Sequence, residues 1–316
     1  MKNNNQANIC SMTLGIDLGG SNLRWVIANE DGYGDVSKLR APRTYDDSIK
    51  ILSEIINESG KLNQLTSVGI GVPGRTDPDK PIWLPNLTFL NQSNIGRDLE
   101  YRTGIPVTFI NDAQAALVGE VEFGAARGCR NSILVTLGTG IGGAIMINGD
   151  IYVGHNGTAG SFGWLMAPVR LHANPEHGPW ERWAAGAALN SIAKDLGMSS
   201  RDLLSQKTLE SEGVAKAALI DYINRIGKGL GSLAALLDPQ IIIVSGGIVD
   251  SWEILRSEIS HGFLQTVSPS VRNCPIKVAG LGSHAGAIGA AVTSRKYFAN
   301  IRQPKKEITD GQKNIH

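Results

Sequence analysis

The sequence predicts an α/β protein made of two similar lobes with a cleft between them. A glycine-rich hairpin pattern occurs twice, at residues 15–29 and 135–150, as an apolar run, a glycine turn and a second apolar run. The elements expected from the first copy onward follow the order β–β–β–α–β–α, which indicates a mixed sheet with helices on its faces. A chain of 316 residues is long enough for two lobes of ordinary size.

The small lobe is expected to contain the first hairpin, three further strands and three helices. Asp46 or Asp47 is expected to cap the first helix and Asn94 the second. Pro73-Gly74 is a strong turn signal that ends a buried strand. The expected strands are 12–17, 23–29, 36–40, 68–72 and 105–110, and the helices run from the Asp46 region to residue 60, from 94 to 101 and from 113 to 123.

The large lobe is expected to begin at residues 124–131. Residues 154–183 are irregular and rich in Gly, His and Trp, and such long stretches inside compact domains are often functional. The expected strands are 132–137, 141–147, 240–244 and 276–279, with helices within 184–237 and over 252–259. A small-residue helix at 285–297 is expected to cross back to the small lobe. The division is therefore 12–117 plus 285–300, and 118–284, with loose termini at 1–11 and 301–316.

The two glycine turns indicate phosphate binding when they are taken together. Glycine reaches positive φ and lets another group approach the backbone amides, and free N–H groups attract phosphate. One such turn is typical of an ordinary hairpin, but two in similar halves favour a polyphosphate held from both sides. Residues 138–143 also match G-x-G-x-x-G, but a strand and the hairpin signal Asn148-Gly149 follow where a dinucleotide fold requires a helix.

Composition limits the partners and the location. Hydrophobic residues make up 42% and charged residues 19%, and the net charge of +1 predicts no nucleic-acid partner. Cys10, Cys129 and Cys274 form no metal set or CxxC motif, which is typical of reduced thiols in a cytoplasmic protein. No apolar run reaches membrane-spanning length, and the first ten residues lack the apolar core of a signal peptide.

Seven motifs resemble the ROK family of bacterial sugar kinases and sugar-responsive repressors, which includes bacterial glucokinases. The resemblance covers residues 13–291 and implies the two-lobed, actin-like ATPase (ribonuclease H-like) fold, in agreement with the duplicated hairpin. The motifs are Asp-x-Gly-Gly-Ser-x-x-Arg at 17–24, Gly-Val-Pro-Gly at 71–74, Pro-Asn-Leu at 85–87, Asn-Asp-Ala-Gln-Ala-Ala at 111–116, Leu-Gly-Thr-Gly-Ile-Gly-Gly at 137–143, Ser-Gly-Gly at 245–247 and the small-residue run 285–291.

The resemblance implies that ATP and Mg²⁺ bind between the lobes and that a sugar hydroxyl attacks the γ-phosphate. Asp17 would orient Mg²⁺ directly or through water, because this metal usually keeps several waters. Asp17 could instead be a turn residue at the end of a strand. Arg24 could instead be a solvated residue of the hairpin. The ATP and phosphate contacts implied are Gly19, Gly20, Ser21, Asn22, Arg24, Gly138, Thr139, Gly140, Gly246 and Gly247.

Asp112 is the candidate catalytic residue. Phosphoryl transfer needs a carboxylate that takes the hydroxyl proton, and Asp112 ends a strand where a cleft would open. From spacing alone, a cap of the next helix and a general base are equally good interpretations of Asp112, and one residue could do both. The family resemblance favours the role of general base.

The resemblance also implies the acceptor ligands, which are Gly74, Asn86, Asn111, Asp112, Ser161, Trp164 and Glu181. Amide side chains both donate and accept, which suits hydroxyls. Asn86 could instead be a turn residue, and Glu181 a helix acid favoured by the dipole.

The sequence departs from the family at Gly-Glu-x-Gly-His and at the cysteine-rich zinc loop that follows. Here residues 160–164 read Gly-Ser-Phe-Gly-Trp, so Ser161 replaces the acidic sugar ligand and Trp164 the zinc-binding histidine. The cysteine positions hold His172, Asn174 and Pro179. Structural zinc takes four Cys or His ligands, so we expect no zinc site and expect His172 and His177 to be solvated loop residues.

Ser161 and Trp164 predict a sugar-like acceptor other than free glucose, such as an aminosugar, a deoxyhexose or a C7-cyclitol, because a site built for hydroxyls discriminates sharply. Plain glucokinase or hexokinase activity, and a catalytically weak sugar- or nucleotide-binding protein, are the alternatives. About a dozen residues precede Thr13, too few for a repressor's helix-turn-helix domain. A homodimer is expected from the family, and polyphosphate stays open as the donor.

Overall fold

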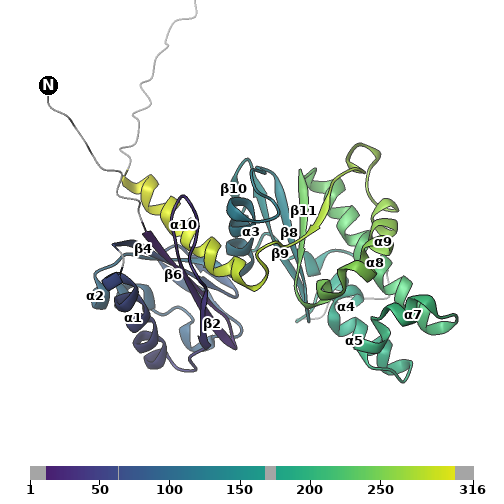
Figure 1. Ribbon diagram of the computed structural model, residues 1–316, viewed down its shortest axis with the longest axis horizontal. Helices are drawn as coiled ribbons and strands as arrows, with labels where there is room; N and C mark the ends of the chain where they lie inside the picture. The colour runs from purple at the N-terminus through teal and green to yellow at the C-terminus, as the bar shows by residue number, and fades with distance from the viewer. Residues whose placement is uncertain (1–11, 63, 168–175, 303–316) are drawn as a thin grey trace, which may run out of the picture.

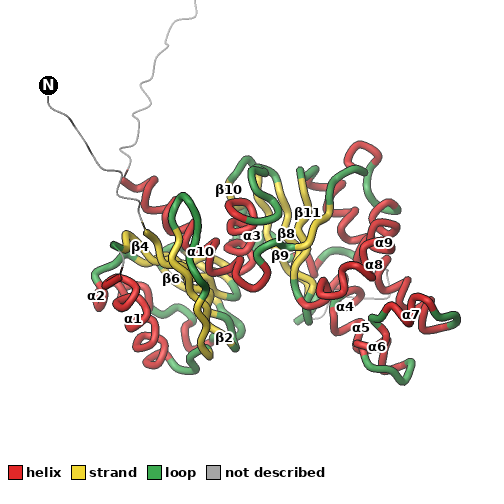
Figure 2. The backbone as a smooth tube through the Cα atoms, viewed as in Figure 1, coloured by secondary structure: helices red, strands yellow, loops and turns green. Residues whose placement is uncertain are grey.

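The computed structural model describes residues 12–62, 64–167 and 176–302, which form two five-stranded mixed sheets. Helices cover both faces of each sheet (Figures 1 and 2). The small-lobe sheet has the order β3-β2-β1-β4-β7, with bounds Ser37–Arg40, Asn22–Ala28, Met12–Leu18, Leu65–Val72 and Val107–Asn111. The large-lobe sheet has the order β10-β9-β8-β11-β12, with bounds Asp150–Ile151, Ile141–Ile147, Ser132–Leu137, Ile241–Ser245 and Ile276–Val278.

The two sheets repeat one topology. β1 is antiparallel to β2 and parallel to β4, and β8 is likewise antiparallel to β9 and parallel to β11. The duplicated hairpin that the sequence predicts is therefore confirmed as a duplicated sheet. A short extra hairpin, β5 (Arg75–Asp77) with β6 (Lys80–Trp83), lies between β4 and β7, where the sequence predicts no strand.

The helices follow the strands in chain order. The small lobe carries α1 (Tyr45–Leu62) and α2 (Ile95–Thr103), and α3 (Asp112–Phe123) lies between the lobes (Figure 1). The large lobe carries α4 (Pro179–Ala184), α5 (Gly186–Asp195), α6 (Ser200–Leu203), α7 (Gln206–Glu210), α8 (Val214–Leu237) and α9 (Trp252–Leu264). The last helix, α10 (Ala285–Arg302), returns to the small lobe as expected.

α10 packs directly onto the small-lobe sheet because two strands present bare backbone to it. Gly15 on β1 and Gly69 on β4 are neighbours in the sheet. A Cβ added to Gly15 would lie 2.0 Å from the carbonyl oxygen of Ala287, and one on Gly69 would lie 1.9 Å from that of Ala290. Leu14 and the other alternate residues of β1 point to the opposite face, into a core shared with α1.

A buried carboxylate ties the end of α3 to the loop before α10. Glu120 has no exposed surface and accepts hydrogen bonds from the backbone N–H groups of Ala125, Gly280 and Leu281 at 2.8, 2.9 and 2.8 Å. Charge-assisted bonds of this kind compensate the carboxylate for its lost water. The chain passes between the lobes at both ends of this contact, and we propose that the lobes divide at 117/118 and 284/285, as the sequence predicts.

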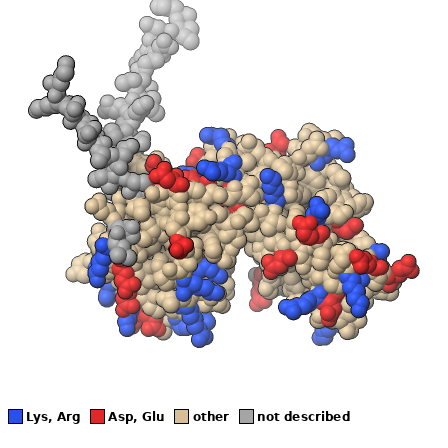
Figure 3. Space-filling view, in the orientation of Figure 1, with Lys and Arg blue, Asp and Glu red and all other residues tan. Residues whose placement is uncertain are grey.

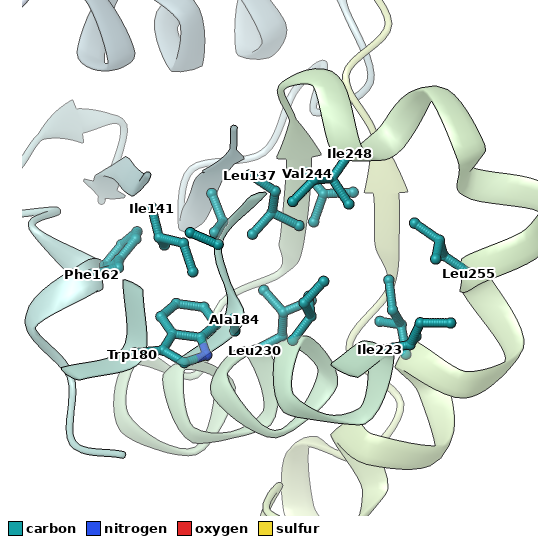
Figure 4. Packing of buried hydrophobic residues seen from close by; sticks show 14 of the residues in the cluster. Leu137, Ile141, Phe162, Trp180, Ala184, Ile223, Leu230, Val244, Ile248 and Leu255 are labelled. Atoms are coloured by element: carbon teal, nitrogen blue, oxygen red, sulfur yellow. The ribbon is translucent and has the colours of Figure 1, made fainter. Parts of the chain in front are cut away.

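The large-lobe core is centred on Trp180. Its ring is 1% exposed, and Figure 4 shows it between α4 and α8, close to Ala184 and Leu230 and below Ile141. Its Nε1 donates to the carbonyl of Arg225 at 3.2 Å. A Cβ on Gly229 would lie 2.0 Å from the ring, so α8 leaves a gap that this indole fills. Trp180 therefore fixes α4 beneath the second hairpin.

Several element ends differ from the prediction. Thr44, not Asp46 or Asp47, caps α1, because its Oγ1 accepts from Asp47 N at 3.1 Å and donates to the Asp47 carboxylate at 2.8 Å. Asn94 precedes α2 but makes no side-chain capping bond. The third strand starts one residue later than expected, and α9 continues five residues past 259.

The charge distribution on the surface and the cysteines do not point to a further functional site. Figure 3 shows acidic and basic side chains on both lobes, with neither sign confined to one of them. Cys129 and Cys274 are free thiols, whereas Cys10 lies outside the described residues. Among the described helices, none combines the length and the apolar character that a membrane crossing requires.

Candidate active site

A cleft of about 650 Å³ opens between the lobes and is lined from both sides. It brings together every acceptor residue that the sequence predicts and three of the expected phosphate contacts. Those residues are Gly74, Asn86, Asn111 and Asp112 from the small lobe and Gly138, Thr139, Gly140, Ser161, Trp164 and Glu181 from the large lobe. The remaining predicted residues do not line the cleft; they are Asp17, Gly19, Gly20, Ser21, Asn22, Arg24, Gly246 and Gly247.

Asn111 and Asp112 stand where β7 passes into α3. Asn111 Oδ1 accepts from the N–H groups of Ala113 and Gln114 at 3.0 and 3.1 Å, and its Nδ2 donates to the carbonyl of Gly74 at 2.9 Å. Asn111 is thus the N-cap of α3, so the capping role that the sequence allows for Asp112 falls chiefly to Asn111. Asp112 Oδ1 accepts from Ala113 N at 2.8 Å. Burial raises the pKa of its carboxyl, and hydrogen bonds from Ala113, its own backbone N–H and Asn111 act in the other direction.

Asp17 and Arg24 form a cross-strand pair behind the first glycine turn. They are opposite one another in the β1–β2 register, with Arg24 Nη1 3.5 Å from Asp17 Oδ2. Burial, and then the charge of Asp112, raise the pKa of Asp17 to about 6, while Arg24 acts in the other direction. Arg24 is therefore an ion-pair partner and not a solvated hairpin residue.

The second glycine turn and the Ser-Gly-Gly motif at 245–247 present bare backbone to open space, as a polyphosphate requires. A Cβ on Gly142 or Gly247 would meet nothing within 4 Å, and one on Gly138 would meet only the carbonyl of Gly140, at 4.0 Å. Gly246 has a φ of +93°, which favours glycine. With a buried carboxylate at Asp17, this arrangement fits Mg²⁺·ATP: the amides suit phosphate oxygens, and the carboxylate suits a hard divalent cation.

The first turn also adjoins the acceptor side of the cleft. A Cβ on Gly20 would lie 3.4 Å from the Cβ of Asn86, which lines the cleft. The β-carbon of Asn86 therefore stands against the turn that carries the first phosphate motif. This contact places a predicted acceptor ligand beside a predicted phosphate ligand.

Glu181 follows the anchored Trp180 and points at the second hairpin. Its Oε2 accepts from the backbone N–H of Ile141 at 2.8 Å, and its Oε1 lies 2.7 Å from Nδ1 of His177. His177 is an exposed loop residue, as the sequence predicts, and its ring in addition binds a residue of the cleft. His172 lies outside the described residues.

Ser161 and Trp164 line the cleft in different ways. The Ser161 hydroxyl donates to the carbonyl of Thr158 at 2.7 Å, within its own turn. Trp164 is 53% exposed and offers a large apolar surface at the cleft. Sequence reasoning missed Arg75 and Trp83, which line the small-lobe side; their only signal was their place between Gly74 and the Pro-Asn-Leu motif.

No set of three or more His, Cys, Asp or Glu side chains that could hold a metal occurs among the described residues. Pro179 begins α4, whereas His172 and Asn174 lie outside the described part of the chain. The expected lack of a zinc site therefore stays a prediction.

Comparison with known proteins agrees with this geometry. The ROK family model matches residues 13–296. This chain belongs to the ROK family. A glucokinase of Streptomyces coelicolor is 30% identical over 311 residues, which covers 90% of this chain and 98% of the relative.

Two solved structures share the fold of this ROK protein. The ROK hexokinase of Thermus thermophilus has a TM-score of 0.79 and 27% identity, covering 92% of this chain and 99% of its own. A ROK glucokinase of Streptomyces griseus in complex with glucose and AMPPNP has a TM-score of 0.71 and 28% identity, covering 90% of this chain and 100% of its own. The predicted family and the actin-like ATPase fold are thus confirmed.

Proposed function

We propose that this ROK protein is an ATP-dependent kinase that phosphorylates a hydroxyl of a sugar-like acceptor, with Asp112 as the general base. The observation that carries the proposal is the cleft itself. Its lining includes the Asp112 carboxylate, the acceptor residues predicted in the small lobe and the glycine turn of the large lobe, which supports the proposal. The enzyme is a phosphotransferase with an alcohol group as acceptor, as the named kinases among its relatives support.

Asp112 takes the proton of the attacking hydroxyl. The acceptor oxygen forms a bond to the γ-phosphorus, the bond from that phosphorus to the bridging oxygen breaks, and ADP leaves. A raised pKa makes Asp112 a better proton acceptor once it is ionised, because the burial that disfavours its charge also favours its protonation. Asn111 holds the start of α3, and hence Asp112, through its two capping bonds.

Mg²⁺·ATP, when bound, supplies the phosphoryl group and a counter-charge for it. Asp17 would hold the metal, directly or through water. Phosphate oxygens would bind the amides of the turns that hold Gly19, Gly20, Ser21 and Asn22 in the small lobe and Gly138, Thr139 and Gly140 in the large lobe. Gly246 and Gly247 would lie on the adenosine side. Arg24 would balance the charge of Asp17, which it contacts.

Gly74, Asn86, Asn111 and Glu181 would bind acceptor hydroxyls, while Ser161 and Trp164 set which acceptor fits. Ser161 has no carboxylate to replace the family's glutamate, and its hydroxyl already donates to Thr158 within its own turn. The aromatic wall of Trp164 favours an acceptor that is less polar at that edge. A modified hexose such as an aminosugar, or a C7-cyclitol, satisfies both conditions. Cytoplasmic location and a homodimer belong to the same proposal.

Plain glucokinase activity is the second candidate, favoured by the Streptomyces relatives. A coupled ADP-release assay separates the two. Purified protein is given Mg²⁺·ATP with glucose, mannose, glucosamine, N-acetylhexosamines or C7-cyclitols, and Asp112→Asn is the control. Turnover on one modified acceptor that Asp112→Asn abolishes supports the proposal, and equal or better turnover on glucose contradicts the acceptor assignment. No turnover on any acceptor, or activity that survives in Asp112→Asn, contradicts the kinase mechanism.

A further inference from the structure

Glu181 is fixed at both of its carboxylate oxygens. The backbone N–H of Ile141 binds Oε2, and His177 Nδ1 binds Oε1. Because an ionised carboxylate can only accept, His177 donates this bond. A Cβ on Gly140 would lie 2.4 Å from Oε2, so the carboxylate fits directly against the bare backbone of the second turn.

The position of Glu181 decides how the cleft can bind an acceptor. Of the described residues that line the cleft, Asp112 and Glu181 carry the carboxylates. Asp112 has the reacting proton to take, and the Ser161 hydroxyl donates to Thr158. Glu181 is therefore the charged acceptor left for a hydroxyl or amino group of the substrate.

His177 acts from outside the cleft. It does not line the cleft, its side chain is 55% exposed, and it precedes Glu181 by four residues. Nε2 lies 4.0 Å from a carboxylate oxygen of Glu176, which is itself 83% exposed. The imidazole thus stands between two carboxylates and contacts the inner one closely.

We propose that His177 is a positioning residue for acceptor recognition. The Ile141 bond alone holds one oxygen and leaves the carboxylate free to rotate, whereas the His177 bond fixes its plane. The ordering cost of this long side chain is then met before the substrate arrives, which raises affinity for the acceptor and leaves ATP binding unaffected. The inference rests on the proposed function, because it assigns Glu181 to the acceptor.

The test compares His177→Ala, His177→Asn and Glu181→Gln, alone and combined, with His261→Ala as the matched control. His261 is an exposed histidine on α9, a helix that gives no residue to the cleft. The probes are the acceptors of the ADP-release assay, which are glucose, mannose, glucosamine, N-acetylhexosamines and C7-cyclitols. For each variant we would measure kcat, the KM values of sugar and ATP, the thermal midpoint, and sugar binding without ATP by calorimetry.

We expect His177→Ala to raise the sugar KM and Kd about tenfold, with kcat and the ATP KM within about twofold of wild type. His177→Asn should recover most of the loss because an amide N–H can replace Nδ1–H. Adding His177→Ala to Glu181→Gln should cost nothing further.

An unchanged sugar KM in an active His177→Ala variant overturns the inference alone. Equal rises in the KM of sugar and of ATP with a lowered thermal midpoint also overturn it, since they indicate a merely structural role. Wild-type protein that binds none of these acceptors overturns it together with the proposed function. Sugar binding without turnover separates the two, because the calorimetric effect of His177→Ala then still decides the inference.

Discussion

The two halves of the molecule share one scaffold and differ in where they carry charge. β1, β2, β4, β7 and α3 correspond in order and direction to β8, β9, β11, β12 and α10. The residue before the end of β1 is Asp17, and its counterpart on β8 is Thr136. α3 begins at Asp112, whereas α10 begins at Ala285.

In the mechanism proposed above, the duplicated fold supplies the shape of the cleft, and the first half supplies both reactive carboxylates, Asp17 and Asp112. Asp17 and Asp112 are close enough for the charge of Asp112 to raise the pKa of Asp17. In the second half, the Oγ1 of Thr136 and the Oγ of Ser245 are neighbours at 3.2 Å and carry no charge. A polyphosphate between the halves would thus meet neutral hydroxyl groups on the wall of the second half. A carboxylate pair in their place would repel the phosphate charge.

Removing the base should have the largest effect. Asp112→Asn keeps the size and the contact with Ala113 but cannot take a proton, so kcat should fall by about 10²–10⁴-fold. Thr136→Val, at the uncharged wall of the second half, should change kcat by less than about tenfold. Steady-state ADP release by both variants measures the contrast. Equal losses in the two would contradict the assignment of chemistry to one half.

Asp17 should make stability depend on pH in the metal-free protein. Its folded pKa of about 6 is above the ordinary 3.8, so folding favours the protonated form. Stability therefore falls as pH rises from 3.8 to 6, by at most about 3 kcal/mol, and stays lower above that range. Asp17→Asn should be more stable than wild type at pH 7.5 and about equal at pH 4.

Thr136→Val provides the comparison for Asp17, because its stability difference from wild type should be the same at both pH values. Thermal unfolding at pH 4 and pH 7.5 checks this. A constant difference for Asp17→Asn would show that the Asp17 carboxylate is not strained by burial.

Glu120→Gln tests the contact that ties the end of α3 to the loop before α10. The amide would turn an N–H₂ group toward backbone N–H donors, and we expect a loss of about 2 kcal/mol in the free energy of unfolding. Glu122→Gln is the matched control on the same helix, where the partly exposed ion pairs with Arg295 and Lys296 should contribute less than about 1 kcal/mol. Chemical denaturation measures both. The comparison fails if the two variants lose the same stability.

The smallest expected effect separates binding from packing within one turn. A Cβ on Gly142 meets open space, whereas one on Gly143 would lie 2.0 Å from the carbonyl of Leu134. Gly142→Ala should fold normally and raise the ATP KM about fivefold by narrowing the phosphate site, a factor near 1 kcal/mol. Gly143→Ala should instead lower the thermal midpoint. Reversed results would place the phosphate on the other side of the hairpin.

Local patterns predicted much of this architecture. The hairpins were predictable because apolar runs and glycine turns act over a few residues, and the cleft residues because each belongs to a short motif. Thr44 was missed because Asp46 and Asp47 are equally good capping residues by type. The Asp17–Arg24 pair needs the strand register, which composition does not give.

The other missed contacts depend on tertiary structure. Glu120 binds Gly280 and Leu281 across more than 150 residues of sequence, and no local signal links them. His177 and Glu181 are only four residues apart, a spacing that would have indicated contact had α4 been predicted to start earlier. The irregular stretch before α4 concealed that relation.

The return of α10 to the small lobe sets an order on how the chain can be completed during translation. When residue 284 has been added, every described strand of both sheets has been synthesised. The face of the small-lobe sheet that carries Gly15 and Gly69 still lacks α10, the helix that covers it. The large lobe, made in between, has all of its own strands by then. The small lobe, whose strands leave the ribosome first, is thus the lobe that is completed last.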